Sequence, residues 1–392
     1  MNKPVANPNA PAYAAIACGG TGGHLFPGVA VGRELRRRGC DVTLLVSSKE
    51  IDRQAVAGAG DMHVVALPGT GFGIAQLPGF VRGFCQSYRV AGRLFQQRPP
   101  QFVLAMGGFT AAPPVLAGRR AGAQTFLHEA NSIPGRANRW LARITDAAFV
   151  YFAQAGEKLP SGRFEVTGMP VRDELLRLPS AVAARRALGL KTDGPVLLVM
   201  GGSQGARSIN ELTVAILPQL LEAMPQLQFI HLTGSSDLEK IQAAYAVRQC
   251  PAVVRPFLTE MELALGAADA AVSRAGASSL AEFAACQLPA LLIPYPTAAD
   301  NHQYHNAQAF AQTGAARVLE QHTLSSGLLA AEILALLGNV EQRSAMRRAL
   351  AAWHWPQAAA NIADRMLRGP AAAASHARSA APHSSKLGAL NV

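Results

Sequence analysis

Short apolar runs alternate with longer amphipathic stretches along most of the chain. The apolar runs cover residues 14–17, 41–46, 62–67, 101–105, 124–127, 147–151, 196–200, 228–232, 252–255, 270–273, 290–293 and 316–319. Such runs are typical of strands buried on both faces of a sheet, and intervals of about 10 to 15 residues with helical patterning are typical of crossover helices. The pattern therefore predicts βαβ units, parallel sheets and an α/β fold.

The same alternation divides the chain into two similar halves. Each half opens with a strand, a glycine-rich turn and a helix, which predicts two doubly wound, Rossmann-like domains over 12–171 and 172–355. A last helix, 356–369, is expected to pack back on the first domain, and the low-complexity tails 1–11 and 370–392 are expected to be disordered. Ligands of such sheets bind at the carboxyl ends of the strands, so two facing sheets predict one cleft between the domains.

The two glycine turns have closely similar sequences. The first, CGGTGGHLFPG, covers Cys18–Gly28, and the second, MGGSQGARSIN, covers Met200–Asn210. Neither carries the Gly-Lys-Ser/Thr of a P-loop or the GxGxxG and acidic residue of a dinucleotide site. A helix N-terminus with unpaired N–H groups behind glycine still favours an anion, so each turn is predicted to bind phosphate. The alternative is that the glycines only let strand and helix pack closely.

Three further features add candidate chemistry. His24 stands in the first turn of a predicted helix, where the helix dipole favours the neutral imidazole that accepts a proton. Glu282 follows the small-residue turn of SRAGASSLAEFA and could hold a ribose diol or merely complement the helix dipole. The stretch from Pro294 to Phe310 is rich in amides suited to sugar hydroxyls. Its Asp300, His302 and His305 could also be taken for metal ligands, which we consider the weaker interpretation.

The composition favours an intracellular protein with an anionic partner. Five widely spaced cysteines and no CxxC pair are typical of a reducing compartment. The net charge is +11, but residues 13–171 carry 17 Lys and Arg against 9 Asp and Glu, whereas residues 172–351 carry 14 against 15. No acidic residue lies between Asp61 and Glu129, so an anionic partner is expected at this half: an acidic lipid, a diphosphate or a nucleic acid.

Residues 77–97 predict an amphipathic helix within this basic region. Phe80, Phe84, Tyr88, Ala91 and Phe95 share one side, with Arg82, Arg89 and Arg93 beside or opposite them. We expect Phe80, Phe84, Arg82 and Arg89 to contact an anionic membrane surface. The alternative is an ordinary surface helix that buries its aromatic side in the core.

Four motifs together resemble the glycosyltransferase family that makes lipid II. They are GGTGGHLFPG, HEANSIPGRANRWL, MGGSQGARSIN and SRAGASSLAEFAACQLPALLIPYPTAADNHQYHNA, and the resemblance runs from about residue 14 to 368. It implies the two-domain GT-B architecture and transfer of N-acetylglucosamine (GlcNAc) from UDP-GlcNAc, with inversion, to the 4-hydroxyl of the N-acetylmuramoyl (MurNAc) unit of undecaprenyl-diphospho-MurNAc-pentapeptide (lipid I). It also implies no metal or other cofactor, and a peripheral location on the cytoplasmic face of the plasma membrane.

The resemblance further assigns roles to single residues. Those expected to bind substrate are Thr21, Gly22, Gly23 and Asn131 at the donor or the cleft facing it, Arg172 and Ser203 at the UDP phosphates, Leu258 at the uracil, Ala277, Ser278 and Ser279 at the diphosphate, Glu282 at the ribose, and Gln303 and Asn306 at the sugar. His24 and Glu129 are expected on the acceptor side. Either could be the base, and His24 could instead bind the acceptor diphosphate.

Two other functions compete with this one. A UDP-sugar 2-epimerase would share the architecture, but it would bring carboxylates to the sugar ring and has no use for a basic, acid-free stretch. A nucleic-acid-binding protein would use the arginines, but the stretch carries no RNP-like aromatic pattern or helix-turn-helix signature, so no nucleic-acid partner is expected.

Overall fold

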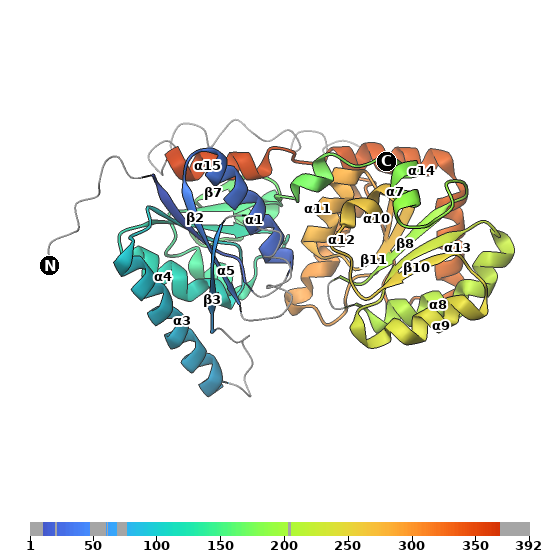
Figure 1. Cartoon of the computed structure of the whole chain (residues 1–392), viewed down its shortest axis with the longest axis horizontal. Helices are drawn as coiled ribbons and strands as arrows, with labels where there is room; N and C mark the ends of the chain where they lie inside the picture. Colours follow the sequence, from blue (N-terminus) through green and yellow to red (C-terminus); the bar gives the residue numbers. More distant parts are fainter. Residues whose placement is uncertain are drawn as a thin grey trace, which may run out of the picture.

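The computed structural model describes residues 11–19, 22–47, 60, 62–68, 77–202 and 205–368. Two lobes lie side by side, each built on one parallel sheet covered by helices (Figure 1). The first sheet has the strand order β3-β2-β1-β4-β5-β6-β7, and the second has the order β10-β9-β8-β11-β12-β13. The order reverses beside β1 in one lobe and beside β8 in the other, which is the doubly wound topology. The predicted α/β fold with two such units is confirmed.

The first lobe contains the elements before residue 167 and the last helix. Its strands are β1 (Tyr13–Ala17), β2 (Asp41–Ser47), β3 (His63–Leu67), β4 (Phe102–Ala105), β5 (Gln124–Glu129), β6 (Ala147–Val150) and β7 (Phe164–Val166). Its helices are α1 (Gly22–Arg37), α3 (Leu77–Gln97), α4 (Ala112–Arg120), α5 (Arg136–Leu141), α6 (Ala153–Glu157) and α15 (Ala358–Arg368).

The second lobe follows the connection after β7. Its strands are β8 (Val196–Met200), β9 (Gln228–Leu232), β10 (Ala252–Arg255), β11 (Ala270–Ser273), β12 (Ala290–Leu292) and β13 (Arg317–Val318). Its helices are α7 (Ala181–Ala187), α8 (Arg207–Ala223), α9 (Leu238–Val247), α10 (Met261–Ala267), α11 (Ala277–Cys286), α12 (His302–Gln312), α13 (Ser326–Gly338) and α14 (Val340–Ala351).

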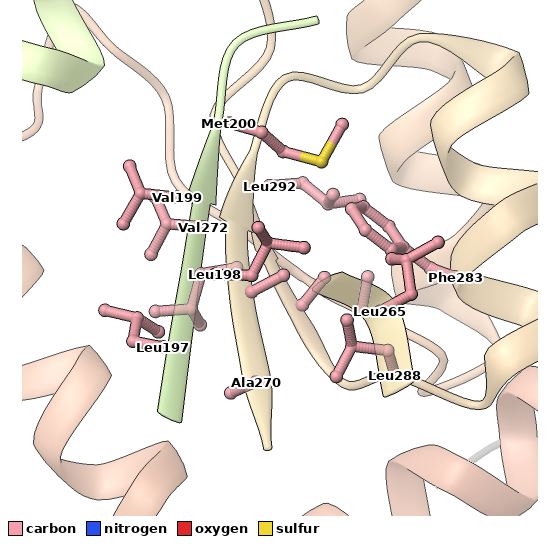
Figure 2. Packing of buried hydrophobic residues seen from close by; sticks show 14 of the residues in the cluster. Leu197, Leu198, Val199, Met200, Leu265, Ala270, Val272, Phe283, Leu288 and Leu292 are labelled. Carbon is pink, nitrogen blue, oxygen red and sulfur yellow. The ribbon is translucent and has the colours of Figure 1, made fainter. Parts of the chain in front are cut away.

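The core of the second lobe lies on both faces of its sheet, as expected for continuous apolar strands. In Figure 2, Leu198 and Met200 of β8 point toward Phe283 of α11, whereas Leu197 and Val199 point to the opposite face. All five side chains are at most 6% exposed. Because both faces are covered, the strand needs apolar residues at every position, which is the signal that identified it in the sequence.

Helix α15 returns the chain to the first lobe and lies along α1 (Figure 1). Arg38 in the turn after α1 pairs with Asp364 at 2.7 Å, and Arg365 pairs with Glu165 of β7 at 3.0 Å. The first lobe is therefore completed by residues from the opposite end of the chain. The predicted division at residues 171/172 stays a prediction, and the predicted tails lie outside the described residues, apart from Pro11.

The glycines of the two turns serve two purposes. A β-carbon on Gly19 would lie 2.2 Å from the backbone nitrogen of Ser47, and one on Gly205 would lie 2.2 Å from the carbonyl oxygen of Thr233. These two glycines allow close packing of backbone segments. A β-carbon on Gly202 would meet nothing within 4 Å, but its φ of +89° lies in the left-handed region that favours glycine. This glycine therefore serves the backbone conformation of the turn and not close packing.

Candidate active site

A cavity of about 670 Å³ lies between the lobes, at the carboxyl ends of both sheets. Gly22 and Gly23 at the start of α1 line it from the first lobe, and Gly201 and Gly202 after β8 line it from the second. The prediction that both glycine turns face one cleft is thus confirmed. Thr21 and Ser203, which were predicted to bind substrate in these turns, lie outside the described residues.

His24 enters the cavity from the first turn of α1 and rests against a glycine pair. A β-carbon on Gly107 would lie 2.9 Å from His24 Nε2, and one on Gly108 would lie 3.5 Å from His24 Cε1. Both glycines have positive φ, +116° and +77°, and both line the cavity. The backbone of Gly107 and Gly108, directly after β4, thus lies against the imidazole of His24, which stands at the positive end of the α1 dipole. We call this pair of glycines the seat of His24. This seat was not predicted, although Met106–Gly107–Gly108 follows an apolar run in the same way as the two glycine turns.

Glu129 ends β5 and is 2% exposed. Its Oε1 accepts hydrogen bonds from the backbone N–H of Asn131 at 2.8 Å and from Asn131 Nδ2 at 3.2 Å. Its Oε2 accepts from the backbone N–H of Gly135 at 2.9 Å and from Asn138 Nδ2 at 2.8 Å. Burial raises the pKa of this carboxyl, and the four hydrogen bonds oppose that effect. Glu129 therefore organises the loop over 130–135, and its expected role as a base stays a prediction.

Arg172 and Glu282 form an ion pair at the wall of the second lobe. Their side chains are 13% and 12% exposed, and Arg172 Nη2 lies 2.8 Å from Glu282 Oε1. Arg172 also donates to the carbonyl of Thr259 at 3.2 Å and stacks over the ring of Phe26 of α1 at 4.5 Å. Arg172, Glu282 and Phe26 all line the cavity. The stacking partner Phe26 was not foreseen, because no local pattern pairs it with a residue of the other lobe.

The N-terminus of α11 opens into the same cavity. Its N-cap is Gly276, and Ala277, Ser278 and Ser279 form the first turn, all at the cavity surface. Ser278 Oγ reaches the carbonyl of Gly23 in the first lobe at 3.5 Å. The N–H groups of this turn and the helix dipole favour an anion here, and the diphosphate contact expected of it stays a prediction.

Of the three residues predicted to bind the sugar or the uracil, one lines the cavity and two do not. Gln303 lines the cavity and accepts the backbone N–H of Tyr295 at 3.0 Å and of Ala275 at 3.3 Å through Oε1. Asn306 is 0% exposed and is not among the residues that line the cavity, and the sugar contact expected of it stays a prediction. Leu258 also lies outside the cavity lining, where its neighbour Phe257 is found.

Asp300, at the rim of the cavity, is engaged by arginines. It lies 2.7 Å from Arg139 Nη2 and 3.8 Å from Arg136 Nη2 of the other lobe. Among the residues that the structure describes, no group of three or more His, Cys, Asp or Glu side chains is arranged to hold a metal ion.

Helix α3 turns most of its aromatic side inward. Phe95 is 2% exposed, and Phe84 and Tyr88 pack against the core of the first lobe. Phe80 contacts Phe84 at 6.2 Å between ring centroids. Arg82 and Arg89 are exposed, and the N-terminal end of the helix projects beyond the lobe (Figure 1). Phe84 is thus half-buried, and the membrane contact expected of it stays a prediction.

Over the described residues, no helix is both long and apolar enough to span a membrane.

The fold and the shared cavity define a class of protein, the GT-B glycosyltransferases. The chain resembles the crystal structure of MurG from Acinetobacter baumannii, with a TM-score of 0.69 and 26% identity over 92% of this chain and 100% of that one. A UDP-N-acetylglucosamine 2-epimerase structure shares the fold, with a TM-score of 0.65 but 12% identity, over 91% of this chain and 96% of that one.

Sequence relatives narrow the class to one family. The chain matches the glycosyltransferase family 28 N-terminal domain over residues 14–150 and the family 28 C-terminal domain over residues 196–365. It is 36% identical, over 89% of this chain and 91% of the relative, to the UDP-N-acetylglucosamine–N-acetylmuramyl-(pentapeptide) pyrophosphoryl-undecaprenol N-acetylglucosamine transferase of Anaeromyxobacter sp. (strain Fw109-5). The enzyme of the same name from Parasynechococcus marenigrum (strain WH8102) is 39% identical over 83% of this chain and 87% of the relative. The chain belongs to this family of N-acetylglucosamine transferases.

Proposed function

We propose that the chain transfers GlcNAc from UDP-GlcNAc to the 4-hydroxyl of MurNAc in lipid I and so forms lipid II for peptidoglycan synthesis. The observation that carries this proposal is the single cavity bordered by Gly22 and His24 from one lobe and by Gly202 and the α11 N-terminus from the other. A sugar bound between them would have an anion site on one side and a proton acceptor on the other.

The second lobe is the proposed donor site. The diphosphate would lie against the first turn of α11, at Ala277, Ser278 and Ser279, where helix N–H groups and the dipole favour negative charge. Arg172 would add a formal positive charge beside it. Glu282, held by Arg172 at 2.8 Å, would accept hydrogen bonds from the ribose diol. Gln303 has its amide oxygen bonded to backbone N–H groups, which leaves the amide nitrogen as its donor toward the sugar.

The first lobe is the proposed acceptor side, with His24 as the base. The acceptor 4-oxygen would attack the anomeric carbon from the face opposite UDP, forming the new C1–O bond as the bond to the diphosphate oxygen breaks. His24 would take the hydroxyl proton, and the α11 dipole together with Arg172 would stabilise the charge on departing UDP. Glu129 is left out of proton transfer because four protein donors already occupy its oxygens.

The lipid acceptor places the enzyme at a membrane surface, and we propose peripheral binding at the cytoplasmic face. The exposed arginines of α3, Arg82 and Arg89, support this, since basic side chains near an anionic leaflet each contribute about 1 kcal/mol. Phe80 and Phe84, both half-buried on the same helix, are the aromatic side chains proposed to join them.

The proposal is tested by supplying labelled UDP-GlcNAc with and without lipid I and following label into lipid. Wild-type protein should form labelled lipid only with lipid I. His24→Gln should lower kcat by about 10²- to 10⁴-fold and leave the Kd for UDP unchanged. The matched control is His63→Gln, on the exposed side of β3, which should turn over normally. Absence of labelled lipid with wild-type enzyme would reject the function, and normal turnover by His24→Gln would remove His24 as the base.

A further inference from the structure

Helix α1 of the first lobe faces the second lobe along most of its length. Phe26, Arg33 and Arg37 are separated by seven and four residues, so they lie on one face of the helix. Phe26 contacts Arg172 near the N-terminus of α1. Arg33 and Arg37, in the C-terminal half, are not among the residues that line the cavity. Their contacts with the second lobe therefore lie outside the site itself.

The partners of these two arginines are consecutive carboxylates, Asp173 and Glu174. Arg33 Nη1 lies 3.2 Å from Glu174 Oε1 and 3.8 Å from Asp173 Oδ2. Arg37 Nη2 lies 2.7 Å from Asp173 Oδ2. Two positive charges one helical turn apart thus face two negative charges across the boundary between the lobes.

The two carboxylates open the short 3-10 helix η3 (Asp173–Leu176). Leu175 of this helix is 2% exposed in the core of the second lobe, and η3 packs against α10 and α11. Arg172, directly before η3, bonds Glu282 of α11 at 2.8 Å. The ion pairs therefore attach α1 to the segment of the second lobe that carries Arg172 into the cavity.

The arginine side of these contacts belongs to a larger network of charges. Glu34 accepts hydrogen bonds from both Arg37 and Arg38. Arg38 in turn pairs with Asp364 of α15 at 2.7 Å. Hydrogen bonds to Asp173 and to Glu34 raise the pKa of Arg37.

Membership of a network matters because the pairs with η3 are partly exposed. Single exposed pairs contribute little, since two long side chains must be ordered to form them and salt screens them. Side chains that other charges already hold lose less freedom when they meet η3. The pairs between the lobes are therefore stronger than isolated pairs of equal exposure.

We infer that the two arginines of α1 and the two carboxylates of η3 form an electrostatic latch that holds the lobes together across the cavity. This inference rests on the proposed function, in which donor and acceptor bind to opposite walls and react only when those walls are close. Arg33 is nine residues beyond His24, about 14 Å along the helix axis at about 1.5 Å per residue. The latch thus sets the spacing of the walls without touching substrate, and salt weakens it.

The test is a charge swap. One variant reverses the latch on α1, Arg33→Glu with Arg37→Glu, a second reverses it on η3, Asp173→Arg with Glu174→Arg, and a third combines the four changes. Each reversed variant sets like charges against each other and should lower kcat about tenfold, because fewer molecules have closed lobes. The Kd for UDP should stay within about twofold, since UDP is proposed to lie on the second lobe. The combined variant restores opposite charges and should recover kcat to within about threefold of wild type.

The matched control is Lys240→Glu. Lys240 forms an exposed pair with Glu211 at 3.1 Å inside the second lobe, so its reversal should leave kcat at the wild-type value. Three results would overturn the inference: an equal fall of kcat in Lys240→Glu, no recovery in the combined variant, or a rise in the Kd for UDP that matches the fall in kcat. The last would show that the reversed charges only displace Arg172.

A neutral variant, Arg33→Gln with Arg37→Gln, tests the latch without introducing like charges. Raising NaCl from about 0.1 to about 1 M shortens the Debye length from about 10 to about 3 Å. The kcat of wild type should fall at least about twofold more than that of the neutral variant, which has no latch left to screen. Equal salt dependence in the two proteins would contradict the latch.

Small-angle X-ray scattering of the ligand-free proteins separates this inference from the proposed function. The radius of gyration should increase in both reversed variants, return toward the wild-type value in the combined variant, and stay unchanged in Lys240→Glu. These differences in a protein that forms no lipid II would sustain the latch and reject the transferase reaction. An unchanged radius of gyration in both reversed variants would reject the latch, whatever their activity.

Discussion

The seat of His24 gives the sharpest mutational prediction, through Gly107→Ala. The added β-carbon would lie 2.9 Å from His24 Nε2, closer than unbonded heavy atoms tolerate. The atom in its way belongs to the tip of a side chain, so the imidazole should swing aside while the backbone stays. The residue would also hold a φ of +116°, which costs an alanine about 1 to 3 kcal/mol. The variant should thus lose both stability and alignment of its base.

The two losses can be separated by magnitude and by a control. Displacing the ring by about 1 Å should lower kcat about 100-fold, or about 2.7 kcal/mol in activation free energy. Gly39, in the turn between α1 and β2, has a φ of +77°, and a β-carbon added there would meet nothing within 4 Å. Gly39→Ala should therefore share the loss of Tm and keep kcat.

The assay is lipid-linked product formation at saturating substrates, with Tm measured on the same samples. Normal kcat in Gly107→Ala would show that the position of the imidazole does not matter for turnover. An equal fall of kcat in both alanine variants would show that the loss reflects backbone strain alone. Either outcome would refute the reasoning about His24.

Three other predictions follow from the described contacts. Glu129→Gln, which places an amide nitrogen among four donors, should lower the free energy of unfolding by about 1 to 3 kcal/mol; a turnover loss of about 100-fold or more at unchanged Tm would instead restore Glu129 as the base. Burial lowers the pKa of His231 to about 3, whereas in the unfolded chain it is about 6.5. The unfolded state thus binds this proton first as pH falls, so the free energy of unfolding in urea should be full above about pH 6.5 and decline below it, by at most about 1.4 kcal/mol per pH unit from this group; an identical slope in His231→Gln would contradict this. Arg82→Glu combined with Arg89→Glu should weaken sedimentation with anionic vesicles by about tenfold or more while Arg348→Glu in the second lobe does not, and equal binding by both variants would exclude α3 as the contact surface.

The strands could be predicted because their signal is local. Buried parallel strands are apolar throughout, so Val196–Met200 and Gln228–Leu232 were placed at the residues where the structure has them. β7, Phe164–Val166, is missing from the predicted strands. It is three residues long, half-buried and at the edge of its sheet, so it lacks the continuous apolar run on which the prediction depended.

The sequence could predict those parts of the site whose residues follow one another directly in the chain. The glycine turns and the α11 N-terminus carry their chemistry in consecutive residues, and the structure brings them to one cavity. The roles of Glu129 and Asn306 depend on partners instead. Asn306 Oδ1 accepts the backbone N–H of Ser132, 174 positions away, and nothing in the amide-rich stretch around Asn306 distinguishes a side chain that faces the sugar from one that faces the other lobe. The same holds for Phe84, which is partly buried against the core of the first lobe.

The central claim is that a nucleotide sugar spans the cavity from the α11 turn to His24. A crystal structure of the protein with UDP-GlcNAc tests it most directly. We expect the diphosphate within hydrogen-bond distance of the backbone N–H groups of Ala277–Ser279, the ribose on Glu282, and the anomeric carbon facing His24. A nucleotide bound against Gly22 in the first lobe, or a sugar pointing away from His24, would contradict it.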